Sequence, residues 1–177
     1  MTFEVFLNMS KILRLEGLPF KVVLSEVEDW IKELSSIEPS TIHMISNRLG
    51  RASGECYVEF KEASDAKSVL ETCDEKTIGN SNRYVKIYTT DQEELNWQVQ
   101  RQDLFKGKTG NELFCVRMYG LPFRTSEYEI AKWFLVAKAN CVDVQLHLNA
   151  QGKRSGDATA FFKTLEEAEK AMERYVQ

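Results

Sequence analysis

Three side chains in the first half of the sequence could together bind a flat aromatic ligand. Phe20 ends a Gly-Leu-Pro-Phe tetrapeptide, Arg51 lies in a glycine-flanked turn, and Tyr84 opens an alternating apolar segment. Two aromatic rings and a guanidinium can sandwich a nucleobase, and stacking contributes about 1–3 kcal/mol per base. Basic residues that would add local positive charge are Lys21, Arg48, Arg124 and Arg154. Contacts from such residues to phosphates would make binding salt-dependent.

No pattern typical of an enzyme or a metal site accompanies these residues. The four cysteines form no C-x-x-C pair, and the two histidines have no zinc-ligand spacing to them. The loop at residues 17–21 contains one glycine and a proline without a backbone N–H, so it is a poor cradle for a phosphate. We therefore expect no catalytic residues, no metal and no cofactor. Free thiols are typical of a reducing compartment.

The composition is that of a globular protein with a mildly acidic balance. Of 177 residues, 43% are hydrophobic and 28% are charged, which is enough apolar material for a packed core. A formal net charge of −4 argues against a protein that coats nucleic acid without specificity, but it allows a local basic patch. No apolar run approaches the length of a membrane span, and the N-terminus lacks the pattern of a signal peptide. A membrane partner is therefore not expected.

Two short motifs occur twice in the chain. A heptapeptide reads RLEGLPF at residues 14–20 and RMYGLPF at residues 117–123, and a turn reads GRASG at residues 50–54 and GKRSG at residues 152–156. After each heptapeptide comes an S-x-x-E string, Ser25 to Glu28 and Ser126 to Glu129, which has the spacing of a helix capping box. The chain therefore contains two copies of one unit.

Each copy has the element order β-α-β-β-α-β. Apolar residues recur at helical spacing at Val27, Trp30, Ile31 and Leu34 in the first copy and at Ile130, Trp133, Phe134 and Ala137 in the second. Strands are predicted at residues 41–45, 55–60 and 83–88 and at residues 142–148 and 157–162, with second helices around residues 66–73 and 168–175. This order predicts an α+β fold with two ferredoxin-like domains, each a four-stranded antiparallel sheet with two helices on one face.

We place the first domain at residues 11–90 and the second at residues 113–177. The connecting residues 91–112 are polar, and residues 94–104 could form a short helix that lies back on the first domain. The second copy has no match to the strand at residues 83–88, which would leave an open sheet edge and suggests a fragment of a longer protein. The strand-like residues 3–7 are expected to fill that edge, within the chain or in a strand-swapped dimer. A truncated chain with a frayed end is the alternative.

The exposed sheet face differs from that of an RNA recognition motif, which uses the same fold. The pattern of its third strand aligns with residues 53–60, where Tyr57 is retained but Glu55 replaces the first stacking aromatic. The second copy has Asp157 and Thr159 at these positions. Much of the aromatic platform that stacks bases is therefore missing.

On the first strand of each copy, an arginine occupies the position where an RNA recognition motif has a stacking aromatic residue. Strand alternation directs Leu13 and Leu15 toward the helices and Arg14 toward the open face. We expect Arg14 to pair with Glu55 across the sheet, and Arg117 to pair with Asp157 in the second copy.

These motifs, taken twice and in order, resemble the tandem quasi-RNA-recognition motifs of the heterogeneous nuclear ribonucleoprotein F/H family and the related epithelial splicing regulators. The resemblance covers roughly residues 11–102 and 113–177. It rests on the two Gly-Leu-Pro-Phe strings, the Gly-Arg-x-Ser-Gly-Glu and Gly-Lys-x-Ser-Gly-Asp turns, and Arg83-Tyr84 at the start of the fourth strand.

The resemblance implies that loops at the rim of the sheet bind single-stranded, guanine-rich RNA. The family's rim residues match Phe20, Arg51 and Tyr84 in the first copy and Phe123 and Lys153 in the second, where the tyrosine has no match. Arg83, beside Tyr84, and the basic residues Lys21, Arg124 and Arg154 complete the expected RNA-binding set. The family's arginine before Gly-Leu-Pro is replaced by Glu16 and Tyr119, and a carboxylate there would repel phosphates. Further candidates are Arg14, Arg48, Tyr57 and Arg117. A role in splicing or RNA processing in the nucleus, and also in the cytoplasm, with partners in ribonucleoprotein complexes, follows from the family alone.

Structural roles for the same residues remain open on the sequence alone. Phe20 and Phe123 could pack in the core, and Arg51 and Lys153 could be solvated turn residues. Tyr57 and Tyr84 could simply cover the sheet. A protein-interaction module that binds a peptide or a partner domain is the alternative function.

Overall fold

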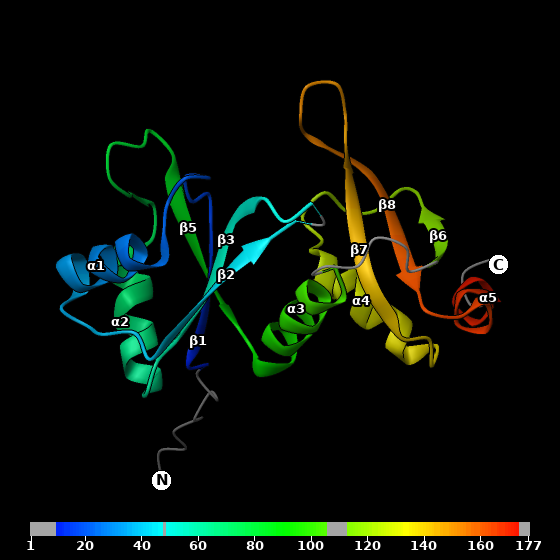
Figure 1. The fold of residues 1–177 in the computed structure, drawn as a ribbon, viewed down its shortest axis with the longest axis horizontal. Coiled ribbons are helices and arrows are strands. Elements are labelled where there is room, and N and C mark those ends of the chain that lie inside the picture. The colour runs from blue at the N-terminus through cyan, green and yellow to red at the C-terminus, as the bar shows by residue number, and fades with distance from the viewer. Residues whose placement is uncertain (1–9, 48, 106–112, 174–177) are drawn as a thin grey trace, which may run out of the picture. The chain divides into compact units, whose positions relative to one another are not determined.

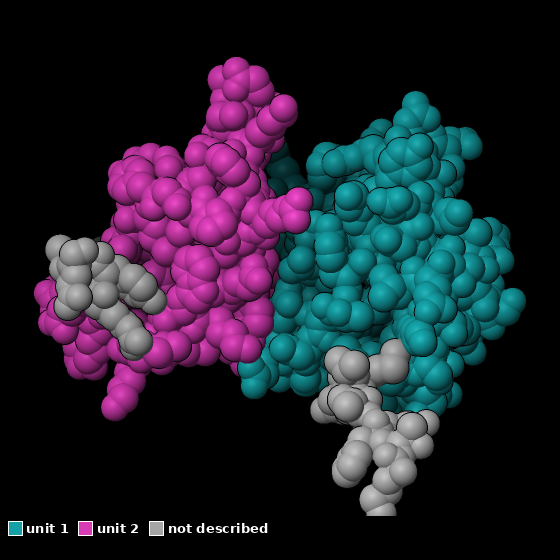
Figure 2. All heavy atoms as spheres, turned by 180° about the vertical axis from the view of Figure 1, so that it is seen from behind, with its two compact units in different colours: residues 1–96 teal, residues 97–177 magenta. Residues whose placement is uncertain are grey.

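The computed structural model describes residues 10–47, 49–105 and 113–173. The chain divides into two compact units, Met1–Asn96 and Trp97–Gln177, which Figure 2 distinguishes by colour. Residues 3–7, Arg48 and Tyr175, on which parts of the sequence interpretation rest, lie outside the described residues. No described helix has the length and apolarity that crossing a membrane requires.

Unit 1 is an antiparallel sheet with helices α1 and α2 against one face (Figure 1). Its strands in chain order are β1 Ile12–Glu16, β2 Thr41–Ser46, β3 Ala52–Glu59, β4 Lys76–Thr77 and β5 Tyr84–Thr90. Their order in the sheet is β2-β3-β1-β5-β4. The helices are α1 Leu24–Ser35 and α2 Ala63–Cys73. The predicted element order is confirmed, and the short strand β4 is an addition that the sequence pattern did not indicate.

The core of unit 1 lies between the sheet and these two helices. Leu13 and Leu15 are fully buried there, as strand alternation predicts. Val27, Trp30 and Ile31 form the buried stripe of α1. The prediction that Leu34 belongs to this stripe is wrong, because its side chain is exposed. Leu34 lies in the last turn, just before Ser36 leaves the helical conformation with φ 60°.

The predicted capping box forms in unit 2 but not in unit 1. In unit 2, Glu129 N–H donates to Ser126 Oγ at 3.1 Å, and Ser126 N–H donates to the Glu129 carboxylate at 2.7 Å, as predicted. In unit 1, α1 begins at Leu24, so Ser25 lies inside the helix and its predicted box is wrong. The glutamate half of the box is made by Glu26, which accepts from the N–H of Val23 at 2.8 Å. Valine has no side-chain oxygen for the other half.

Helix α3 Gln92–Phe105 contains the predicted linker helix. Its residues up to Asn96 belong to unit 1, where Leu95 is buried and Glu94 reaches the sheet. Its later residues belong to unit 2. The expectation that the helix lies back on the first domain therefore describes only its first turns.

Unit 2 repeats the fold with a smaller sheet. Its strands are β6 Phe114–Met118, β7 Cys141–Leu148 and β8 Arg154–Phe162, in the order β6-β8-β7. Helices α4 Glu127–Val136 and α5 Leu165–Glu173 pack against the sheet around Ile130 and Phe134. The Phe134 and Phe162 rings meet edge to face, with 5.2 Å between centroids. Within the described part of unit 2, β6 is an edge strand with β8 as its one neighbour, so the predicted four-stranded sheet is present with three strands.

Trp97 and Arg101 anchor the second part of α3 to unit 2. Trp97 Nε1 donates to the carbonyl oxygen of Cys141 at 3.1 Å, and Arg101 donates to that of Val144 at 3.1 Å. Arg101 also pairs with the carboxylates of Glu127 and Asp143. Asp143 is completely buried, so Arg101 compensates a charge inside the domain.

Candidate nucleic-acid interface

The antiparallel register brings three segments of unit 1 to one end of the sheet. Glu16, the last residue of β1, lies opposite Glu55 of β3 and Lys86 of β5. The loop after β1, the turn before β3 and the start of β5 must therefore meet. We call residues 17–21, 49–54 and 80–84 the rim of unit 1.

Glycines allow the rim segments to approach closely. Leu18 N–H donates to the carbonyl oxygen of Gly54 at 2.9 Å. A Cβ on Gly54, which has φ +82°, would lie 3.0 Å from the Leu18 carbonyl oxygen and 3.4 Å from the Phe20 ring. A Cβ on Gly17, at φ +89°, would lie 2.5 Å from the Tyr84 carbonyl oxygen. Both the left-handed conformation and the close contact require glycine here.

Phe20 and Tyr84 are both exposed on the rim, at 62% and 66%. The Phe20 ring lies beside Gly54, and the guanidinium of Arg83 is 5.2 Å from its centroid, within the range of a cation–π interaction. The interpretation that Phe20 packs in the core is therefore wrong. The structure brings Phe20, Arg83 and Tyr84 to one end of the sheet with their side chains open to a ligand.

The turn before β3 is organised by an asparagine that the sequence interpretation missed. Asn47 Oδ1 accepts from the N–H of Leu49 at 2.9 Å and from that of Arg51 at 3.1 Å. The Arg51 side chain is exposed. Asn149 stands at the same place relative to the second turn and accepts from Gln151 and Lys153, so the repeat itself could have revealed it.

The rim of unit 2 (residues 120–124 and 150–156) has the same construction. Leu121 N–H donates to the Gly156 carbonyl oxygen at 2.8 Å. The Phe123 ring is 67% exposed and lies 3.5 Å from the position of a Cβ on Gly156. Arg124 and Lys153 are exposed as well. The two heptapeptides therefore recur because each builds the same loop crossing.

The two rims differ in their side chains. Arg154 donates to the carbonyl oxygens of Phe123 at 3.1 Å and Thr125 at 2.9 Å, so it braces the loop in unit 2. Ala52 occupies the matching place in unit 1. The described part of unit 2 contains no counterpart of Tyr84. Tyr119 is exposed, and the guanidinium of Arg117 lies 5.1 Å from its ring centroid.

The sheet face of unit 1 is closed by the start of α3. Tyr57 is completely buried, and its hydroxyl donates to Glu94 Oε1 at 2.8 Å. Thr90 donates to the other carboxylate oxygen at 2.6 Å. Burial, with the charge of Glu94, raises the pKa of Tyr57. The prediction of Tyr57 as an accessible stacking residue is wrong, because a helix beyond the repeat covers it.

Arg14 completes this network. Its guanidinium donates to Glu94 Oε1 at 2.7 Å and pairs with Glu16 at 3.1 Å. The predicted pairing with Glu55 is wrong, because the register places Arg14 opposite Tyr57 and Glu16 opposite Glu55. Burial alone would lower the pKa of Arg14, but the charges of Glu16 and Glu94 outweigh it and raise the pKa. Arg14 thus offsets the carboxylate of Glu16 near the rim.

Arg117 in unit 2 does pair as expected. Its guanidinium lies 3.9 Å from the carboxylate of Asp157. More than half of this arginine side chain is exposed, so the pair adds little to stability.

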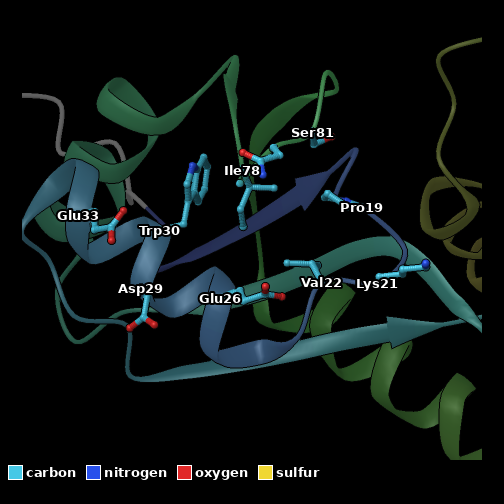
Figure 3. Close-up of a pocket in the computed structure, with 11 residues that line it drawn as sticks. Pro19, Lys21, Val22, Glu26, Asp29, Trp30, Glu33, Ile78 and Ser81 are labelled. Atoms are coloured by element: carbon cyan, nitrogen blue, oxygen red, sulfur yellow. The ribbon is translucent and has the colours of Figure 1, made fainter.

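A cavity of about 520 Å³ lies between α1 and the segment before β5 (Figure 3), and residues of the unit 1 rim form part of its lining. Trp30 and Ile78 contribute apolar surface to it. Along α1, carboxylates line it at Glu26, Asp29 and Glu33, and Lys21 is the one basic residue of the lining. Phosphates would be repelled from this side. Phe20, Arg51 and Arg83 are exposed and are not part of this lining.

The buried thiols are protonated at neutral pH. Burial raises the pKa of Cys56 and Cys141 to about 12 and that of Cys73 to about 11. Cys115 is exposed. Among the described residues, no cluster of three His, Cys, Asp or Glu side chains could hold a metal ion.

Sequence comparison identifies related proteins. A family profile described as RRM domain matches residues 13–103 and 116–177. Heterogeneous nuclear ribonucleoprotein F from Bos taurus is 28% identical over 165 residues, which cover 93% of this chain and 39% of that protein. Heterogeneous nuclear ribonucleoprotein H from Homo sapiens is 30% identical over 165 residues, 93% of this chain and 36% of that protein. The chain thus spans less than half the length of these curated relatives.

Among solved structures, the crystal structure of the Glorund qRRM2 domain is 27% identical. The match covers 49% of this chain and 96% of that one, with a TM-score of 0.42.

Proposed function

This chain belongs to the RRM domain family, with two such domains related to those of heterogeneous nuclear ribonucleoproteins F and H, and we propose that it binds single-stranded, guanine-rich RNA through its rims. The observation that carries this proposal is the Phe20 ring, which stands exposed at the rim beside Gly54 with the Arg83 guanidinium over it. The sheet face of the same unit is closed by Glu94.

A base would stack on Phe20, and an unpaired strand makes its bases available for this. Guanine presents two acceptors, O6 and N7, which suit the paired donors of a guanidinium. Arg83 and Arg51 provide the guanidinium groups of this rim, and both side chains are exposed. Their position favours guanine over uracil, and their charge favours the phosphate backbone.

Unit 1 is expected to bind more tightly than unit 2. Its rim has Tyr84 as a second exposed aromatic residue, whereas the exposed Tyr119 of unit 2 precedes the rim and has the Arg117 guanidinium beside its ring. In unit 2, Arg154 is engaged with backbone carbonyl groups, which leaves Arg124 and Lys153 as exposed cations.

The biological role proposed here follows from the relatives. Their names describe nuclear ribonucleoproteins, so we place this chain in the nucleus, within ribonucleoprotein complexes that process RNA. Pre-mRNA splicing is the form of processing that the family resemblance favours.

The test is a fluorescence-anisotropy titration with short G-rich and U-rich single-stranded RNAs at two salt concentrations. The proteins are wild type, the double variant Phe20→Ala/Arg51→Ala, and the control Leu24→Ala/Lys67→Ala. The control removes one exposed apolar side chain and one exposed cation from the helical side of the same unit.

Wild type and control should prefer the G-rich RNA, and affinity should fall with salt. The rim variant should lose at least about tenfold in affinity, since removal of one stacking residue costs about 1–3 kcal/mol. Circular dichroism would verify that each variant is folded. Equal affinities for all three proteins would overturn the rim as the binding site.

A further inference from the structure

The cavity between α1 and the segment before β5 combines an apolar base with an acidic side (Figure 3). Its volume of about 520 Å³ lies within the range of ligand pockets, about 300–1,000 Å³. Trp30 and Ile78 form the base, and both are almost completely buried in the core of unit 1. Pro19 and Val22 add apolar surface beside them.

Hydrogen bonds hold the two sides of this cavity together. Trp30 Nε1 donates to the carbonyl oxygen of Thr77 at 2.9 Å, which joins α1 to the residue before Ile78. The N–H of Ser81 donates to the Ile78 carbonyl oxygen at 3.2 Å and closes the turn on the other side. Because the indole N–H is already engaged, the base suits an apolar group of a ligand.

Three exposed carboxylates follow α1 along the cavity, at Glu26, Asp29 and Glu33. Spacings of three and four residues place them on one face of the helix, over about 10 Å. Within the part of the chain that the structure describes, neither Asp29 nor Glu33 pairs with a basic side chain. Lys32, the one basic residue of α1, pairs with Glu28 and Glu38 at 2.9 Å each.

Comparison with unit 2 separates these carboxylates from the needs of the fold. The two copies are offset by 103 residues, and at this offset Lys132 stands in place of Asp29 and Val136 in place of Glu33. Helix α4 forms with these residues. The fold therefore does not explain why unit 1 has an acidic row here.

We propose that this cavity binds a basic segment of a partner protein, with an apolar side chain of that segment against Trp30 and Ile78. The carboxylates attract arginine and lysine side chains and repel nucleic acid. An extended chain advances about 3.3 Å per residue, so about three or four residues match the length of the acidic row. A lone cation would leave the apolar base unused.

The test is a fluorescence-anisotropy titration of the full chain with three labelled peptides. GRRFRG has arginines around a phenylalanine, GRRARG lacks the ring, and GEEFEG reverses the charges. Wild type should bind GRRFRG at least about fivefold more tightly than GRRARG, because the ring buries apolar area. It should not bind GEEFEG measurably.

The double variant Asp29→Lys/Glu33→Val gives α1 the residues of unit 2. It should lower the affinity for GRRFRG at least about tenfold, because two attractive charges are lost and a repulsive one is added. The matched control is Glu62→Val/Glu71→Lys, which makes the same change in net charge at exposed residues of the α2 region, outside the cavity. The control should lose far less affinity, and circular dichroism would verify that both variants are folded.

Failure of wild type to bind GRRFRG, equal affinities for GRRFRG and GRRARG, or equal losses in the two charge variants would each overturn the cavity as a peptide site. Phe20→Ala/Arg51→Ala should retain peptide binding, since this inference does not depend on RNA binding. Loss of peptide binding in that variant would assign the peptide to the rim instead.

Discussion

The backbone N–H of Leu18 donates a hydrogen bond to the carbonyl oxygen of Gly54 at 2.9 Å. This bond joins the Gly-Leu-Pro-Phe loop to the Ser-Gly turn, and Leu121 makes the same bond to Gly156 at 2.8 Å. The two repeated motifs are therefore two sides of one loop crossing. Their recurrence preserves the position of an exposed aromatic ring, and no reactive group is needed to explain it.

Substitution of Gly54 should disturb this crossing. Gly54→Ala adds a Cβ 3.0 Å from the Leu18 carbonyl oxygen, at a residue with φ +82°. The matched control is Gly50→Ala, which has φ +71° and nothing within 4 Å of its added Cβ. Both variants incur about 1–2 kcal/mol for the left-handed conformation.

We expect Gly54→Ala to lose at least about 1 kcal/mol more than the control in urea unfolding, because the backbone must shift. RNA affinity should fall as well, since Phe20 moves with the loop. Equal stability of the two variants would contradict the tight crossing.

Arg83 should contribute to RNA binding without stabilising the fold. Its side chain is exposed, with the guanidinium over the Phe20 ring. Arg83→Ala should lower affinity for G-rich RNA about 5- to 30-fold, a loss of about 1–2 kcal/mol. Arg83→Lys keeps the charge but loses the planar donor pair, so it should retain salt dependence and lose preference for guanine.

The anisotropy titration described above measures both effects. Lys86→Ala removes an exposed cation from β5, the strand that follows Arg83, and is the control. A similar loss for Lys86→Ala and Arg83→Ala would indicate a general charge effect.

The Arg101–Asp143 pair should be required for the stability of unit 2. Arg101→Leu leaves the carboxylate of Asp143, which is completely buried, without its cation. Removal of one partner from a buried pair costs about 3–5 kcal/mol. Addition of Asp143→Asn to Arg101→Leu should recover part of this loss, as a double-mutant cycle in urea unfolding would show. Lys170→Ala breaks an exposed pair with Glu166 and should have a far smaller effect.

Stability should decrease in alkaline solution. The pKa of Cys56 and Cys141 rises from the ordinary 9.0 to about 12 in the folded chain. Above pH 9 the unfolded chain releases these protons while the folded chain retains them. Their stabilising contribution is therefore complete below about pH 9 and is lost as the pH rises toward 12.

Urea unfolding at intervals from pH 7 to pH 11 measures this dependence. Cys115→Ser should leave it unchanged, because Cys115 is exposed. Constant stability across the range would contradict the burial of the two thiols.

Much of the fold could be predicted from periodicity, and part of the site could not. Alternate residues of β1 share one face of the sheet, so Leu13 and Leu15 could be assigned to the core. The repeat located both rims and Phe20, but the exposure of the Phe20 ring remained open on the sequence alone. Glu94 left no such signal, because it contacts the sheet as a single polar side chain of a helix with little apolar periodicity. Because of this contact, Tyr57 is buried and is not the accessible stacking residue that was predicted.

The first capping box shows how an offset can mislead. Gly17 and Gly120 are 103 residues apart, and so are Glu26 and Glu129, which have the same role. The S-x-x-E string that begins at Ser25 is separated from the one at Ser126 by a different number of residues. It therefore resembles the second capping box in composition but does not occupy the same position in the repeat. Consistent offsets along the repeat would have identified Glu26.

The Glu94 carboxylate acts toward the sheet of unit 1 as a permanently attached competitor. Asp91 alone separates its helix from β5, so its local concentration at the sheet is that of an intramolecular partner, on the order of millimolar or more. A base that stacked on Tyr57 would have to displace this carboxylate and leave Arg14 without it. Stacking of bases on the sheet of unit 1 is thereby disfavoured, which agrees with the proposed binding at the rims.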